Sequence, residues 1–151
     1  MDSQDTIDVL NTLIETCNDG ERGFRHVAEH AKSPDLRTLF MERANECRQA
    51  CADLRAQVVQ LGGEPETGGS ASGALHRGWT SLVGSVSGWS DKQLLEACER
   101  GEDSAMTRYR DALDEALPDN IRMLIERQYE GVKRNHAQVR TLRDQARAAQ
   151  V

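Results

Sequence analysis

The feature that most constrains this 151-residue chain is a series of apolar stripes in which successive apolar residues lie three or four positions apart. This spacing predicts amphipathic α-helices, because residues three and four apart share one helix face. The strongest breaks between the stripes are Ser33-Pro34, Gly62-Gly63 and Leu117-Pro118. We therefore predict four helices, at about residues 3–31, 34–61, 91–116 and 119–148.

The lengths of the connections predict how these helices are joined. Only short turns, near Lys32 and Pro118, separate the first pair and the second pair, so each pair should form an antiparallel hairpin. Residues 62–90 form a long crossover, in which ALHRGWTSLVGSV predicts a short helix. Two hairpins joined in this way have ferritin-like connectivity. We expect one all-α domain over residues 1–151, a ferritin-like four-helix bundle.

Charge and hydropathy narrow the classes of partner. The chain has 19 Lys and Arg against 25 Asp and Glu, a net charge of -6, whereas unspecific nucleic-acid binding and anionic membranes require a basic face. No apolar run approaches the roughly 18 to 20 residues of a membrane-spanning helix. The N-terminal residues are acidic where a signal peptide would be basic. We expect a cytoplasmic protein that binds neither nucleic acid nor membrane.

Two carboxylates interrupt the predicted inner faces of the helices. Continuing the stripes places Glu21 on the inner face of the first helix and Glu102 on that of the third helix. A buried carboxylate requires an ionic partner or a metal, because the ionised group loses its hydration. Counting residues from the two turns places both carboxylates within roughly two helical turns of Glu46 and His136 along the bundle axis.

Two-metal bundles use one Glu from each of two helices and a Glu-x-x-His from each of the other two. Here the second helix has ECRQ at 46–49 and the fourth has KRNH at 133–136, so Gln49 and Lys133 replace expected ligands. One hypothesis is a mid-bundle site for iron, manganese or zinc, formed by Glu21, Glu46, Glu102 and His136. The other, which the two lost ligands favour, is a polar core network in which Lys133 neutralises Glu21 or Glu102 without metal.

The remaining thiols and imidazoles have simpler interpretations. The cysteines lie on or near the stripes without a CxxC pair, which predicts small buried thiols at Cys17, Cys47, Cys51 and Cys98. A thiol metal or redox site is the alternative, since Cys47 and Cys51 are one turn apart. His26 and His30 are interpreted as two exposed histidines, with a surface metal pair as the alternative.

The crossover carries the sequence His76-Arg77 followed by Trp79. We interpret it as an amphipathic lid with Trp79 and Leu82 tucked beneath it. The alternative is a small patch that binds an anion or a protein partner.

Several separated motifs resemble a bacterial family of ferritin-like four-helix-bundle proteins classified as a domain of unknown function. They are ETCNDGERGF, ERANECRQACADL, LGGEP, SGALHRGW and CERGED followed by RYRDAL. The resemblance implies the ferritin-like fold and no established activity. More distantly, GEDSAMTRY is similar to the third-helix pattern of rubrerythrin-like proteins, which implies metal ligands at Glu21, Glu46, Glu102 and His136. Gln49 and Lys133 depart from that pattern.

These observations favour a non-enzymatic structural, interaction or stress-associated bundle with a degraded two-metal site, assembled as a homo-oligomer. No catalytic residue is predicted. The alternative is a metal-binding protein or oxidoreductase that uses the mid-bundle carboxylates and histidine.

Overall fold

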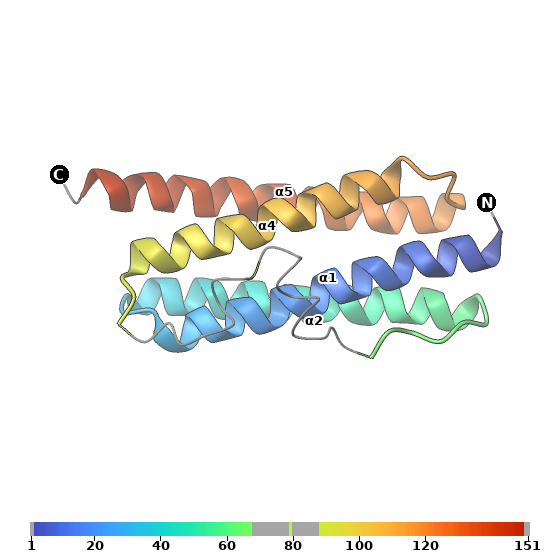
Figure 1. The fold of residues 1–151 in the computed structure, drawn as a ribbon, viewed down its shortest axis with the longest axis horizontal. Coiled ribbons are helices and arrows are strands. Elements are labelled where there is room, and N and C mark those ends of the chain that lie inside the picture. Colours follow the sequence, from blue (N-terminus) through green and yellow to red (C-terminus); the bar gives the residue numbers. More distant parts are fainter. Residues whose placement is uncertain (1, 68–78, 80–87, 150–151) are drawn as a thin grey trace.

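The computed structural model describes residues 2–67, 79 and 88–149, and every regular element within those residues is a helix. The elements are α1 (Ser3–His30), α2 (Pro34–Gln60), α4 (Asp91–Leu113) and α5 (Asp119–Ala148). Figure 1 shows two hairpins side by side, with α1 and α5 running in one direction and α2 and α4 in the other. The predicted four-helix bundle of two antiparallel hairpins is confirmed, and no predicted helix end differs from the observed one by more than three residues.

The connection between α2 and α4 has to run the length of the bundle, because α4 begins at the end opposite to that where α2 stops (Figure 1). Gly62, with φ +82°, ends α2 in the left-handed region that favours glycine. The connection then binds α1, where Asn11 Nδ2 donates to the carbonyl of Glu64 at 3.2 Å and Asn11 Oδ1 accepts from the amide of Glu66 at 2.9 Å. The predicted short helix, His76, Arg77 and Leu82 lie outside the described residues.

Side-chain hydrogen bonds stabilise three of the helix starts. Asp2 caps α1, its Oδ1 accepting the amide N–H of Asp5 at 2.8 Å. Ser33 caps α2, its Oγ accepting the amide N–H three residues later at 3.3 Å. Ser90 and Gln93 form a capping box at α4, with hydrogen bonds of 3.2 and 2.8 Å. α5 begins at Asp119, after the N-cap residue Pro118, and has no side-chain cap. Asp119 lies in the first turn, where the helix dipole favours its charge.

The hydrophobic core consists of two clusters, one toward each end of the bundle. The first contains Leu10, Leu13, Ile14, Leu54, Val58, Ile121 and Ile125 among others. The second contains Phe24, Val27, Phe40, Leu94, Leu95 and Val139 among others. None of the described helices has an apolar stretch of sufficient length to span a membrane. The middle of the bundle therefore lies between two apolar regions.

Among the described residues of the crossover, Trp79 enters the bundle. Its side chain is buried and meets the ring of Phe24 edge to face, with centroids 5.3 Å apart. Gly23 of α1 and Gly101 of α4 make room for the indole, since a Cβ atom at either position would lie within 2.4 Å of a ring carbon. The prediction that Trp79 is tucked into the protein is confirmed. Its ring is consequently not an exposed contact for a partner.

Candidate functional site

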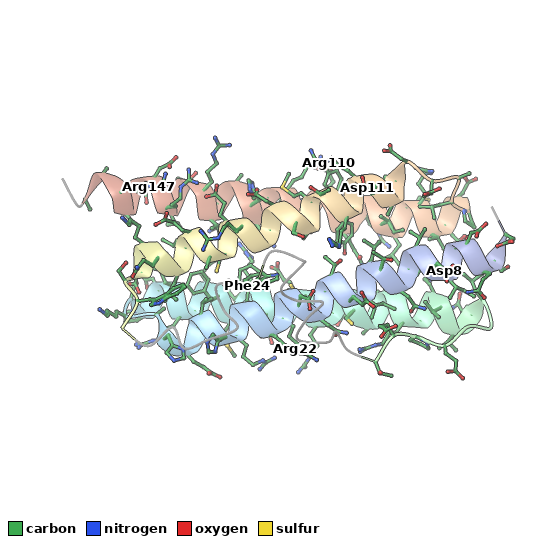
Figure 2. The ribbon with its side chains drawn as sticks, viewed as in Figure 1. Asp8, Arg22, Phe24, Arg110, Asp111 and Arg147 are labelled. Carbon is green, nitrogen blue, oxygen red and sulfur yellow. The ribbon has the colours of Figure 1, made fainter. Side chains whose placement is uncertain are left out.

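A cavity of about 320 Å³ lies in the middle of the bundle, and all four described helices contribute to its wall. Phe24 and Cys17 reach it from α1, Glu46 from α2, Glu102 from α4 and Val132 from α5. In Figure 2 the labelled Phe24 lies on the side of α1 that faces α4, whereas Arg22 points away from the bundle. This cavity occupies the region where the sequence predicts that the polar residues meet.

Glu102 is the buried carboxyl group of the cavity, with 4% of its surface exposed. Its Oε1 atom is buried and has no hydrogen-bond partner. Burial raises the pKa of Glu102 from 4.5 to about 8, against the opposing effect of the nearby Arg43 guanidinium. The carboxyl group is therefore mainly protonated at neutral pH. The prediction that the third-helix stripe buries Glu102 is confirmed.

Arg43 is a buried cation beside the cavity that the sequence stripes did not predict. It is 9% exposed, its Nη1 donates to Glu46 Oε1 at 3.0 Å, and its Nη2 donates to Gln138 Oε1. The other carboxylate oxygen of Glu46 accepts from Asn135 Nδ2 at 2.9 Å. Arg43 lies three residues after Phe40 and four before Cys47, so continuing the stripe of the second helix would have found it.

Lys133 does not have the predicted neutralising role. Its Nζ lies 2.7 Å from Glu130 Oε1 and 4.7 Å from the centroid of the Tyr129 ring, both on its own helix. The hypothesis that Lys133 neutralises Glu21 or Glu102 is therefore wrong. The cation beside the cavity carboxylates is Arg43, whose side chain extends from the inner face of α2 toward Gln138 of α5.

Glu21 is also placed differently from the prediction. Its carboxylate is 23% exposed and pairs with Arg25 at 2.9 Å. It borders an outer groove together with His26 and Glu29, and it does not line the cavity. The buried face of α1 extends through residues 16–20, 23 and 24, so Glu21 falls at the edge of that face rather than at its centre.

His136 lies against α4, where its Nε2 is 2.5 Å from Asp103 Oδ1. Ligand atoms of Glu99, Asp103 and His136 all lie within 4.8 Å of one another, but Glu99 is also paired with Arg143. A second group of this kind in the described part of the chain is formed by His26, Glu29 and His30 on α1. Neither group includes Glu21, Glu46 or Glu102.

Gln49 lies at the exposed edge of the cavity, on α2. Its Nε2 donates to Asp53 Oδ1 at 3.0 Å, so this residue binds its own helix. Of the four predicted metal ligands, Glu46 and Glu102 are thus brought to one cavity, while Glu21 and His136 have partners elsewhere.

The four cysteines are free thiols, and the prediction of small core residues agrees with their burial, which is complete for all except the half-buried Cys47. Burial raises the pKa of Cys17 to about 12 and also raises the pKa of each of the other three. Cys17 Sγ lies 3.3 Å from the hydroxyl of Tyr109, which donates to Gln128 Oε1 at 2.8 Å. These thiols therefore stay protonated at neutral pH and lack nucleophilic character.

The residues of the cavity do not fit a two-metal centre. Such a centre needs about four carboxylates and two imidazoles, all turned inward. Three acidic residues line the cavity. Glu46 is bound to Arg43, Glu102 lies near Arg43, and Asp53 accepts a hydrogen bond from Gln49. Among the buried side-chain oxygens of the described residues, Glu102 Oε1 is the one without a hydrogen-bond partner.

The fold is shared with solved ferritin-like structures. A dodecameric thioferritin, the bacterioferritin-related protein of Bacteroides fragilis, is similar with a TM-score of 0.81 and 17% identity, covering 99% of this chain and 91% of that one. The Dps of Mycobacterium smegmatis gives 0.79 and 18%, covering 92% and 86%. The DPS protein of Vibrio cholerae O1, described as a member of a broad superfamily of ferritin-like diiron-carboxylate proteins, gives 0.74 and 15%, covering 93% and 89%.

These likenesses establish the ferritin-like fold and no more, because all three identities are low. No curated protein matches the chain. A family model does match, over residues 5–115, which include nearly all of α1 and the whole of α2 and α4. The chain belongs to the family described as a domain of unknown function, DUF2383.

Proposed function

We propose that this protein is a non-enzymatic, metal-poor ferritin-like bundle with a structural or interaction role. The observation that carries the proposal is the position of Arg43, whose guanidinium is bound to Glu46 and lies close enough to Glu102 to lower its pKa. A guanidinium keeps its charge at every physiological pH. A permanent cation therefore stands beside two of the three acidic residues that line the cavity, Glu46 and Glu102.

The charge balance supports this proposal. Two divalent cations need several ionised carboxylates to offset their charge and their lost hydration. In the cavity, Arg43 already offsets Glu46, and Glu102 is mainly uncharged at neutral pH. Binding a metal would require Glu102 to lose its proton and Glu46 to leave Arg43, and both steps weaken the apparent affinity.

Binding of a single iron ion is the second candidate. It is favoured by Glu102 Oε1, a buried oxygen without a partner that a metal would satisfy. Iron is the metal to consider, since a structural neighbour is described as one of the ferritin-like diiron-carboxylate proteins. In this candidate Glu102 and Glu46 would hold the ion and Arg43 would have to move away.

Elemental analysis of protein purified without chelators, from cells grown with added iron, distinguishes the two candidates. The proposal predicts less than about one iron per ten chains, because occupancy follows affinity. A content near one iron per chain, lost in Glu102→Ala and kept in Glu126→Ala, would establish the second candidate. Glu126 is the matched control because it is an exposed glutamate on α5.

We further propose that the chain assembles as a homo-oligomer. The support is its similarity to a thioferritin described as dodecameric. Large apolar side chains are also exposed on the described helices, at Met41, Val59 and Met123. Sedimentation velocity should give a mass several times that of the 16.8 kDa chain. A monomer at all concentrations tested would refute self-association.

A further inference from the structure

The mid-bundle cavity has the size and the surface of a small-molecule site. Its volume of about 320 Å³ is at the lower end of the range for ligand pockets, and roughly twice that of a cavity that holds benzene. Phe24, Trp79 and Tyr109 provide aromatic surface, and Ala105 and Val132 provide aliphatic surface. The size and these walls suit a flat molecule of one or two fused rings.

The polar group inside the cavity is Glu102, which is almost completely buried and whose Oε1 atom has no hydrogen-bond partner. Leaving a buried acceptor unsatisfied is costly, so a ligand that supplies a donor gains the energy of that missing bond. Arg43 is close enough to affect the carboxyl electrostatically, and it disfavours a cationic ligand. The same burial disfavours an anion. A neutral donor is therefore the best match.

The cavity is open to a ligand between α2 and α5. Exposed or half-exposed polar residues of these helices, Gln49 and Asp53 on one side and Arg134 and Asn135 on the other, border it. They ring an apolar interior, which is the usual arrangement of a pocket that selects by shape and a few hydrogen bonds. Because Trp79 forms part of the opposite wall, the crossover contributes to the site.

We propose that this cavity binds a neutral aromatic molecule of one or two fused rings, whose hydroxyl group hydrogen-bonds to Glu102. The inference rests on the proposed function in one respect, namely that no metal occupies the cavity. The proposed ligand binds without a metal ion. The thiols of Cys17 and Cys47, which are protonated and part of the wall, add polarizable surface that suits an aromatic ring.

The test is calorimetric titration of metal-free protein with 2-naphthol and with naphthalene, which lacks the hydroxyl group. The wild-type protein should bind 2-naphthol at least about fivefold more tightly than naphthalene, since the hydroxyl satisfies Glu102. In Glu102→Leu, which keeps the buried position apolar, naphthalene binding should persist and the preference should fall to about one. A preference that persists in this variant would overturn the assigned contact.

A second test fills the cavity with a larger side chain. Ala105→Leu should abolish binding of both probes, whereas Ala52→Leu, on the exposed face of α2, should leave both affinities unchanged. The thermal transitions of the variants show whether each is folded. Failure of the metal-free wild-type protein to bind either probe overturns this inference and leaves the proposed function standing. Stoichiometric iron in the purified protein would instead overturn the proposed function.

Discussion

Single residues set the electrostatics in the middle of this bundle. Glu102 is a carboxyl group that burial keeps protonated, and Arg43 is a cation held by Glu46 and Gln138. Both side chains extend from the inner faces of their helices, but their effects differ. Glu102 destabilises the folded state when it ionises, whereas Arg43 limits that cost.

Glu102 should make the protein less stable as the pH rises. Because its pKa is raised from 4.5 to about 8 in the folded state, its proton is held more tightly there than in the unfolded chain. Its contribution to stability is complete below about pH 4.5 and is lost as the pH approaches about 8. Between about pH 5 and pH 8, the free energy of unfolding of the wild type should fall relative to Glu102→Gln by on the order of 3 kcal/mol. Urea denaturation across this range measures the difference, and parallel pH profiles would contradict the buried, protonated carboxyl.

Replacing Arg43 should raise the pKa of Glu102 above about 8, because the guanidinium is the nearby charge that lowers it. In Arg43→Leu, carbon-13 NMR should show that the Glu102 carboxyl group titrates at a higher pH than in the wild type. The exposed Arg48 on the same helix is the control, and Arg48→Leu should leave the titration unchanged. An unchanged titration in Arg43→Leu would show that Arg43 does not affect the Glu102 carboxyl group.

At the scale of secondary-structure elements, Trp79 connects the crossover to the two hairpins. It lies where α1 and α4 each have a glycine, Gly23 and Gly101, and it contributes to the cavity wall. Asp91 adds a second link, since its carboxylate accepts the amide N–H groups of Lys32 and Ser33 at 2.8 and 3.1 Å. The start of α4 is thereby bound to the turn between α1 and α2.

Two matched glycine substitutions test the Trp79 contact. At Gly101 a Cβ atom would lie 2.2 Å from the indole, whereas at Gly131 of α5 the nearest atom would be Arg134 Nη2 at 3.7 Å. Gly101→Ala should therefore destabilise the protein by roughly 1–3 kcal/mol and change the fluorescence of Trp79. Gly131→Ala should stabilise it by up to about 1 kcal/mol, through helix propensity alone. Equal effects of the two substitutions in thermal unfolding would show that Trp79 is not packed against α4.

The elements themselves were largely predictable from the sequence. Stripe spacing and the signals at Ser33, Gly62 and Ser90 act within single helices, so they predicted the helix ends closely. The partner of His136 was not predictable, because its contact with Asp103 depends on the axial and rotational register of α4 against α5. Glu21 was misplaced for a related reason, since the buried face of α1 is broader than one stripe.

At the scale of the whole molecule, the bundle has the ferritin-like fold, and the residues at its centre do not fit a two-metal site. The two core clusters lie toward the ends, and the cavity between them has three acidic residues, a nearby guanidinium and protonated thiols. Such a centre favours neutral, partly apolar contents over a pair of metal ions. The fold thus provides the cavity, and Arg43 and Glu102 determine what it accepts.

Anaerobic titration of the metal-free protein with iron(II), followed by calorimetry, measures whether the cavity binds metal. The expected result is no stoichiometric binding at micromolar iron, because Arg43 and the protonated Glu102 oppose a second and even a first cation. Tight binding of two iron ions per chain, abolished by Glu102→Ala, would contradict it.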